Sequence, residues 1–307
     1  MKRHRISVYL LGGLFLVSLL TAVYVSSDSE AKGERPDGKI RLIVRGDDMG
    51  CCHAANVACI KSYREGIVRT VEVMVPCPWF EEAVKMLREN PGLDVGVHLT
   101  LTSEWDNYKW GPLTCAPSLV NEDGYFYPQT KQWGDWPAGT GFLDAKPDLQ
   151  EVENELRAQI ELAIKKIPQL SHLSAHMKAA ISTPELMELT IGLAKEYDLY
   201  INFLEHGAKL IYGIGKGTDA PEQREAALIE IVEDLKPGLW LLIEHPGMDT
   251  PEARAIGHLG YGHVAKDRDG VTKAFTSEKV KKVIKKREIE LISYRDLKGR
   301  QQKTSPK

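Results

Sequence analysis

The chain has 307 residues, of which 40 are basic, 43 are acidic and 43% are hydrophobic. This composition supplies enough apolar side chains for a core, which excludes an intrinsically disordered or a collagen-like chain. A formal net charge of −3 at pH 7 argues against nucleic acid as a partner. Single α/β barrels commonly contain about 250 residues, so the length suits one such domain with additional segments.

The N-terminal segment has the pattern of an export signal. Three basic residues lie within the first five positions, and the apolar stretch 6–25 that follows carries no charge. A basic start before an apolar run is typical of a secretory signal peptide, and about 20 apolar residues are also enough to cross a bilayer. We therefore expect residues 1–27 to be a signal peptide or an uncleaved membrane anchor, residues 28–38 to be a linker, and the rest to be periplasmic or extracellular. Contact with a membrane is expected only through this segment.

Short runs rich in β-branched residues then alternate with helical patterns, which predicts one domain at residues 39–298. Apolar residues spaced by three or four positions, as in 149–167, indicate amphipathic helices, and Thr-Pro pairs at 183–184 and 250–251 mark helix starts. About seven strand–helix units predict a mostly parallel sheet that closes into a TIM-barrel-like (β/α) barrel. The predicted strands are residues 40–45, 70–76, 95–101, 171–175, 200–204, 240–244 and 288–293.

Two segments interrupt this alternation. Residues 103–146 contain many aromatic side chains among Gly, Pro and Asp, and a loop of this length inside a compact domain is usually functional. Residues 205–220 are rich in glycine and are either a lid or a plain surface connection. Residues 299–307 are expected to be a polar tail.

Polar residues follow four of the predicted strands at their carboxyl ends. Asp47 and Asp48 follow the first strand, and His98, His176 and His245 follow three others. In a barrel, this face carries the active site, to which several strands contribute. Two imidazoles and one carboxylate suit a divalent metal that keeps positions open for water and substrate. The sequence therefore predicts a metal centre at this end of the barrel.

The second carboxylate predicts how water is activated there. If Asp48 binds the metal, Asp47 is placed to take a proton from a metal-bound water. Two adjacent carboxylates repel each other without a cation, which also favours a metal. His245, protonated near neutral pH, is the candidate to donate a proton to the leaving group. These roles predict hydrolysis of an amide or an ester.

Other functions remain open on the residues alone. A metal-dependent phosphoesterase would favour two metals and more ligands than three. An iron oxygenase also uses two histidines and one carboxylate, although nothing else in the sequence indicates its scaffold. A non-catalytic sugar-binding protein on the same scaffold would not need a base beside the ligands.

Four motifs carry a resemblance to a known family. They read LIVRGDDMG at 42–50, GVHLTLT at 96–102, HLSAHM at 172–177 and EHPG at 244–247. In this order they resemble the motifs of the YdjC/ChbG family of carbohydrate deacetylases, and the likeness runs from about residue 40 to about residue 297. The resemblance implies a TIM-barrel-like fold and metal-dependent removal of acetyl groups from N-acetylated sugars such as chitooligosaccharides.

The resemblance also implies roles for single residues. By motif position, Asp47 matches the general base, while Asp48, His98 and His176 match the metal ligands. His245 lies in the His-Pro-Gly segment, and its role as the acid is our inference from the residues. The expected cofactor is a divalent metal, with Mg or Zn expected in preference to Mn or Co. The expected partner is an N-acetylated oligosaccharide or glycan. Weaker candidates for contact with the sugar are Glu244, Trp105, Trp110 and Arg254.

The chain departs from the family pattern at two motifs. Arg45 and Gly46 stand where the family usually has Asn-Ala before the Asp pair. Ser174 stands where the third motif, His-x-Asp-Ser-His, commonly has its Asp. A serine can still hydrogen-bond to a metal ligand, but without the charge of a carboxylate, so we expect an altered metal affinity.

The five cysteines do not add a site. They are odd in number and lack Cys-x-x-Cys spacing, which supports neither a disulfide framework nor a cysteine zinc site. We expect Cys59 and Cys77 to be small buried apolar residues. For Cys52, we expect a role in packing rather than in metal binding.

Overall fold

The first strand, β1 (Ile40–Met49), runs directly into the predicted site. The structure is a computed structural model that describes residues 38–215 and 220–298. β1 pairs in parallel with β6 (Gly238–Glu244) along Ile40–Gly46 and with β2 (Thr70–Val73) near its carboxyl end. It is buried along almost its whole length, as expected for a parallel strand covered on both faces. The last residues of β1 therefore reach the carboxyl edge of the sheet.

The sheet of the described chain is parallel throughout. Its order is β4-β3-β2-β1-β6-β5, and β7 pairs with the first half of β1. The remaining strands are β3 (Asp94–Leu99), β4 (Leu170–Ala175), β5 (Lys209–Tyr212) and β7 (Glu290–Ile292). Because all pairs are parallel, the carboxyl ends of these strands meet at one edge.

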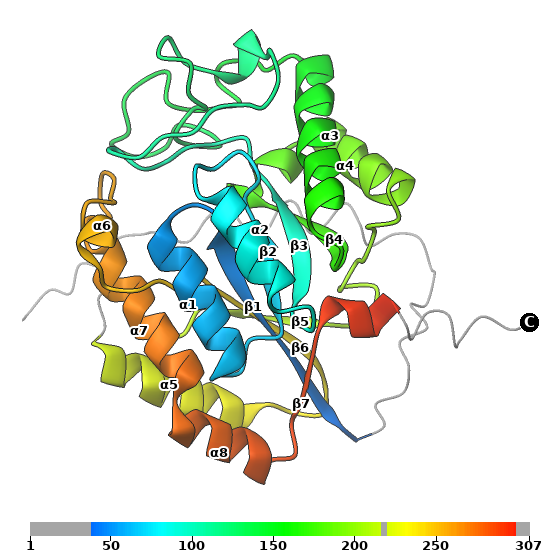
Figure 1. Cartoon of the computed structure of the whole chain (residues 1–307), viewed down its shortest axis with the longest axis vertical. Coiled ribbons are helices and arrows are strands. Elements are labelled where there is room, and N and C mark those ends of the chain that lie inside the picture. The colour runs from blue at the N-terminus through cyan, green and yellow to red at the C-terminus, as the bar shows by residue number, and fades with distance from the viewer. Residues whose placement is uncertain (1–37, 216–219, 299–307) are drawn as a thin grey trace, which may run out of the picture. The chain divides into compact units, whose positions relative to one another are not determined.

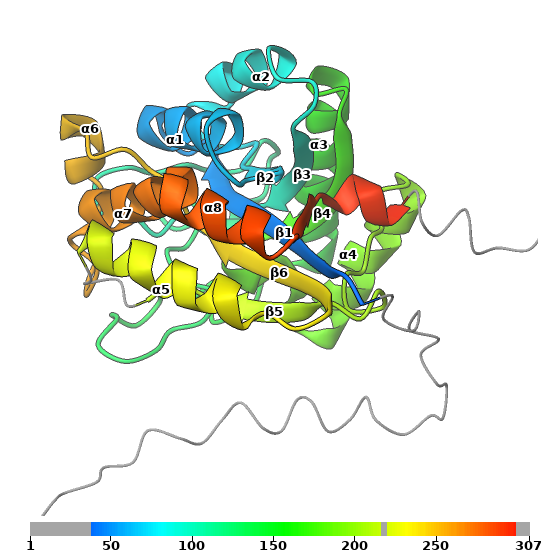
Figure 2. The ribbon, with the colours of Figure 1, turned by 90° about the horizontal axis from the view of Figure 1, so that it is seen from below.

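Helices cover the outside of this sheet (Figures 1 and 2). Thr183 and Thr250 cap their helices before a proline, as predicted from the Thr-Pro pairs. The described helices are α1 (His53–Arg64), α2 (Phe80–Arg88), α3 (Leu149–Lys166), α4 (Pro184–Glu196), α5 (Pro221–Asp234), α6 (Pro251–Arg254), α7 (Val264–Thr276) and α8 (Glu278–Lys286), with the 3-10 helices η1 (Pro117–Leu119) and η2 (His176–Ile181).

One predicted strand is wrong. Residues 200–204 form no strand, because the Asn202 side chain accepts a hydrogen bond from the Leu204 backbone N–H and the chain turns. Such a side-chain bond competes with the ladder of a sheet, and Gly207, at φ 73°, completes the change of direction. The strand comes later, as β5, inside the glycine-rich segment that we predicted to be a lid or connection. The other predicted strands are present with shifted boundaries.

The α/β class and the parallel sheet are thus confirmed, whereas closure into a barrel is not. In the described residues, β4 and β5 are the ends of the ladder and no pairing joins them. The two faces of β1 nevertheless bury different clusters, because successive side chains alternate across a strand. Leu42 and Val44 pack in the larger cluster, while Ile43 joins a smaller one with Leu241 and Tyr294.

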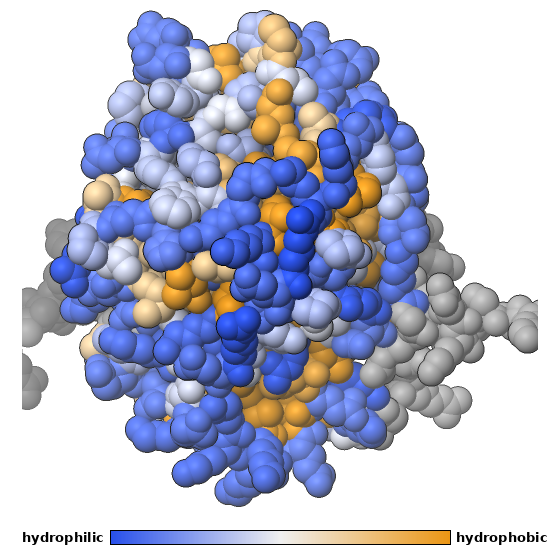
Figure 3. Space-filling view, viewed as in Figure 1, coloured by the Kyte–Doolittle hydropathy of each residue, from blue (hydrophilic) through white to orange (hydrophobic). Residues whose placement is uncertain are grey.

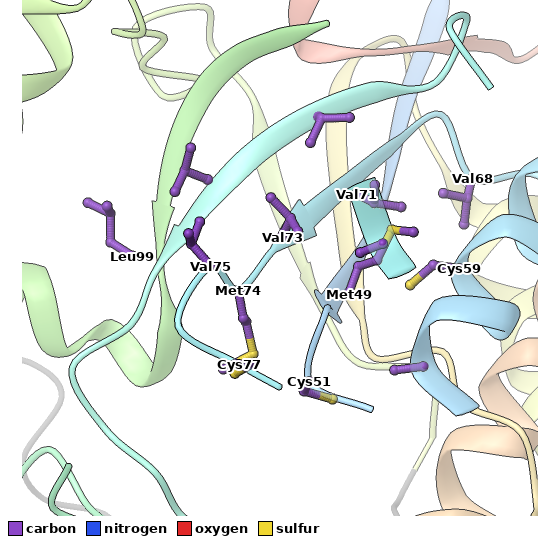
Figure 4. Packing of buried hydrophobic residues seen from close by; sticks show 14 of the residues in the cluster. Met49, Cys51, Cys59, Val68, Val71, Val73, Met74, Val75, Cys77 and Leu99 are labelled. Atoms are coloured by element: carbon purple, nitrogen blue, oxygen red, sulfur yellow. The ribbon is translucent and has the colours of Figure 1, made fainter. Parts of the chain in front are cut away.

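The larger cluster holds the buried cysteines. Figure 4 shows Met49 and Cys59 near Val71, whereas Cys51 lies farther along, toward Met74 and Cys77. Cys59 and Cys77 are buried, as predicted, and all five cysteines are free thiols.

The segment between β3 and α3 caps the carboxyl end of the sheet. It contains η1 and isolated bridges and otherwise follows an irregular path, above the strands in Figure 1. Trp105 and Phe126 are buried in it, whereas Trp133 is exposed. Hydrophilic side chains cover most of the face that Figure 3 shows, with hydrophobic groups between them.

The expected signal peptide or anchor, nearly all of the linker and the polar tail lie outside the described residues. Within residues 38–215 and 220–298, no helix is both long and apolar enough to cross a bilayer.

Candidate metal centre

A strained turn places the Asp pair at the end of β1. Asp48 has a φ of 69°, a left-handed conformation that aspartate tolerates better than most residues do. Gly50 follows with a φ of 97°, and a Cβ there would lie 2.9 Å from the Met74 carbonyl oxygen. The Asn56 side chain accepts a hydrogen bond from the Gly50 N–H at 2.6 Å. Asp48 and Gly50 are therefore suited to the turn itself.

Asp48, His98 and His176 meet in a buried group whose ligand atoms all lie within 4.8 Å of one another. Asp48 Oδ1 lies 3.6 Å from His98 Nε2 and 3.3 Å from His176 Nδ1. Although buried, this oxygen accepts no hydrogen bond. Buried carboxylate oxygens normally have a partner, and an orphaned oxygen that faces two imidazole nitrogens fits a divalent metal. The three residues predicted as ligands are thus brought together.

The other oxygen of Asp48 is held by a residue that sequence reasoning missed. Arg268 of α7 donates to Asp48 Oδ2 at 2.8 Å, and its guanidinium lies 5.1 Å from the centre of the Trp105 ring. Burial opposes ionisation of Asp48, but Arg268 and nearby histidines hold the pKa of this carboxyl well below its usual value. The only signal in the sequence is that Arg268 falls on the apolar side of its helix, four residues after Val264.

Asp47, the predicted base, forms an ion pair with Arg45. The guanidinium donates two hydrogen bonds to the two carboxylate oxygens, each at 2.7 Å, and a third to the Tyr294 hydroxyl at 3.3 Å. Burial lowers the pKa of Arg45, but Asp47 and Tyr294 raise it well above its usual value overall. A carboxylate can accept about four hydrogen bonds, so Asp47 keeps capacity for a water. Asp47 Oδ2 lies 3.7 Å from His98 Nε2, beside the ligand group.

The two ligand histidines have opposite charge preferences. Burial lowers the pKa of His98 to about 4, although Asp47 opposes this effect. Burial also acts against the charged form of His176, but Glu104 and Asp48 raise its pKa to about 10. Glu104 lies 3.0 Å from His176 Nε2. No sequence pattern marked Glu104, which comes from the irregular segment after β3.

These residues line a cavity of about 810 Å³ at the carboxyl ends of the strands. His245 and Trp105 are in its wall, as are His258 and Tyr261, which sequence analysis left out. Trp105 stacks on His258 with ring centres 5.4 Å apart. Glu244 also lines the cavity, but one of its oxygens is occupied by the Ile214 N–H at 2.7 Å.

Two of the weaker candidates lie elsewhere. Trp110 is buried in the core, where its indole N–H donates to the Thr102 carbonyl at 2.8 Å. Arg254 is exposed and forms an ion pair with Asp249 at 2.6 Å. Neither residue lines the cavity, so the geometry does not bring these two candidates into the cavity wall beside the Asp-His-His group.

A parallel α/β fold with a buried Asp-His-His group at its strand ends defines a candidate single-metal centre. Residues 41–286 match the family model described as YdjC-like protein, and the chain therefore belongs to this family. The resemblance seen in the sequence motifs is confirmed.

Similar proteins agree with this family. A carbohydrate deacetylase of Thermus thermophilus is 34% identical over 240 residues, covering 71% of this chain and 82% of that protein. Carbohydrate deacetylase 1 of Listeria innocua is 27% identical and covers 84% of this chain and 100% of its own length. The crystal structure of an Enterococcus faecalis protein, described as a cellobiose-phosphate cleavage protein, has a TM-score of 0.67 at 24% identity and covers 84% of this chain and 99% of that one. This structure shows the shared fold.

Proposed function

We propose that this chain is a metal-dependent hydrolase that removes acetyl groups from N-acetylated carbohydrates. The family and the relatives named carbohydrate deacetylase support carbohydrate deacetylation. One observation carries the metal dependence, namely the buried Asp48 oxygen that accepts no hydrogen bond and faces His98 and His176. Two nitrogen donors and one oxygen donor suit zinc better than magnesium, which prefers oxygen ligands alone.

Asp48 Oδ1, His98 Nε2 and His176 Nδ1 would hold the metal. When bound, a divalent metal lowers the pKa of water and polarises a carbonyl oxygen. Arg268 keeps Asp48 ionised and in place. Glu104, as an acceptor at His176 Nε2, keeps the proton on that nitrogen and leaves Nδ1 toward Asp48.

Asp47 is the proposed base. It takes the proton from the attacking water, while Arg45 fixes the orientation of its carboxylate through two hydrogen bonds. The water oxygen bonds to the acetyl carbon, the C–N bond breaks, and acetate and a sugar amine result. The nitrogen needs a proton as it leaves, because an amide anion is a very poor leaving group. His245, which follows β6 in the cavity wall, is the proposed donor of this proton.

The sugar is proposed to lie at the mouth of the cavity beside His258 and Tyr261, which are half-buried. Trp105 is 2% exposed, so it supports these rings and Arg268 rather than offering a free face. The N-terminal pattern further supports an exported enzyme, either released or held at a membrane by its first residues.

A single metal agrees with amide hydrolysis better than with a two-metal phosphoesterase. Among the described residues, only the group of Asp48, His98 and His176 brings three potential ligands together. A phosphoesterase of the two-metal type would need a second such group about 4 Å away.

The test is acetate release by the full-length protein, purified in detergent and loaded in turn with zinc, magnesium, manganese or cobalt. The substrates are a panel of N-acetylated oligosaccharides, with 4-nitrophenyl phosphate as the alternative. Asp48→Asn is the matched control, which we expect to lose both metal and turnover. Folded wild-type protein that binds metal but releases no acetate from any substrate would contradict the proposal.

A further inference from the structure

Glu72 is a buried carboxylate next to the candidate metal centre. The proposed reaction assigns no role to Glu72. It lies on β2 and is 0% exposed. Its Oε1 accepts a hydrogen bond from His172 Nε2 at 2.6 Å, and its Oε2 accepts one from the Ser174 hydroxyl. Burial raises the pKa of Glu72, but His172 and Arg45 lower it to about 2 overall. Glu72 is therefore a negative charge held inside the sheet.

Ser174 joins this charge to a predicted metal ligand. Its Oγ lies 2.7 Å from His98 Nδ1. A serine hydroxyl has one hydrogen, and an ionised carboxylate can only accept, so that hydrogen goes to Glu72. The serine oxygen must then accept from Nδ1–H of His98. This order leaves the lone pair on Nε2, the nitrogen that faces Asp48 Oδ1.

The register of the sheet builds this arrangement from neighbouring strands. Glu72 pairs with Gly96, Gly96 pairs with His172, and His98 pairs with Ser174. Any side chain at Gly96 would overlap the Glu72 carboxylate and stand 2.5 Å from His172 Nε2. Because Gly96, the glycine of the Gly-Val-His motif, has no side chain, the Glu72 carboxylate can occupy the space beside it.

We propose that Glu72 is a positioning residue for His98, acting through Ser174. It supplies from β2 a carboxylate to the Ser174 hydroxyl that is hydrogen-bonded to His98. The chain of hydrogen bonds fixes the tautomer of His98 and makes Nε2 a stronger donor to a metal. This inference rests on the proposed metal centre. Outer partners of ligating histidines change metal affinity by about 10- to 100-fold.

The test is a double-mutant cycle on zinc affinity, measured by competition with a fluorescent zinc chelator. Glu72→Gln and Ser174→Ala are each expected to weaken zinc binding by about 10- to 100-fold. The double variant should bind zinc no more weakly than the weaker-binding single variant, because the first change has already broken the chain of hydrogen bonds. Ser62→Ala is the matched control, since Ser62 is a buried serine whose hydroxyl has no hydrogen-bond partner.

A rescue variant separates this role from a merely structural one. Ser174→Asp combined with Glu72→Gln places a carboxylate directly beside His98 and removes its repulsion with Glu72. We expect zinc affinity to return toward the wild-type value, in contrast to the loss of about 10- to 100-fold for either single variant. Long-range ¹H–¹⁵N spectra of the metal-free protein should show the Nδ1–H tautomer of His98 in wild type and a mixture in Ser174→Ala.

Equal zinc affinity in Ser174→Ala and wild type would overturn the inference, as would effects of the two single changes that simply add. If Glu72→Gln fails to fold in a thermal melt, Ser174→Ala and its histidine spectra decide alone. Wild type that shows the expected cycle but releases no acetate would refute the proposed function and leave this inference standing. Wild type that binds no zinc would overturn the inference itself.

Discussion

Metal binding to this site should release a proton, mainly from His176. With a pKa of about 10, this imidazole is almost fully protonated at pH 8, and a metal can bind Nδ1 only after the proton leaves. His98, with a pKa of about 4, is already neutral at pH 8. Two ordinary histidines with a pKa of about 6.5 would together release only about 0.1 proton at that pH. We therefore expect about one proton more than an unperturbed site would release.

The sign of the pH dependence follows. Because the metal-free form holds the extra proton, zinc binding tightens as pH rises, by about tenfold per pH unit between pH 5 and about pH 7, and more steeply above that where a bound water also loses its proton. Titration calorimetry at pH 8 in buffers with different heats of ionisation counts the protons directly.

A metal-bound water also loses a proton near neutral pH. The decisive quantity is therefore the difference in the number of released protons between wild type and a variant. Glu104 raises the pKa of His176, and Glu104→Gln should lower the number of protons released at pH 8 toward that of the bound water alone. The same proton count for wild type and Glu104→Gln would refute the role given to Glu104. A wild-type count near zero would refute the assignment of His176 as an imidazolium in the metal-free protein.

Three further predictions concern the proposed reaction and the sheet beneath it. Asp47→Asn should keep zinc but lose acetate release by about 10²- to 10⁴-fold, and loss of zinc instead would show that the two aspartates have exchanged roles. His245→Ala should slow hydrolysis of an N-acetyl sugar far more than that of 4-nitrophenyl acetate, whose leaving group needs no proton, so equal losses in kcat would remove it as the acid. Gly96→Ala should lower the free energy of unfolding by about 1–3 kcal/mol in urea titrations, because a Cβ there overlaps Glu72, and unchanged stability would show that the strands move apart freely.

The ligand group could be predicted from sequence because its members share a local signal. Asp48, His98 and His176 each follow an apolar run with the length of a strand, and parallel strands bring their carboxyl ends together whatever their order in the sheet. The exact register was not needed for that conclusion.

The residues that support the ligands carry no such signal. Glu72 lies inside a strand, Glu104 in an irregular segment and Arg268 on a helix, and each reaches the site only through tertiary packing. Glu72 depends on the pairing of β2 with β3, and Arg268 depends on how α7 packs near the end of β1. The strand predicted at 200–204 is wrong for a similar reason. The apolar pattern of these residues is compatible with a strand, but the Asn202 side chain accepts a hydrogen bond from the Leu204 N–H and turns the chain instead.

The charges around the Asp pair change the argument for a metal. From sequence, two adjacent carboxylates called for a cation to relieve their repulsion. In the structure each has its own arginine, Arg45 for Asp47 and Arg268 for Asp48, so repulsion alone no longer requires one. The arginines leave Asp48 Oδ1 without a hydrogen bond, although they take up its partner oxygen and both oxygens of Asp47. A buried carboxylate oxygen that faces two imidazole nitrogens, rather than net charge, is therefore the observation that favours a metal at this position.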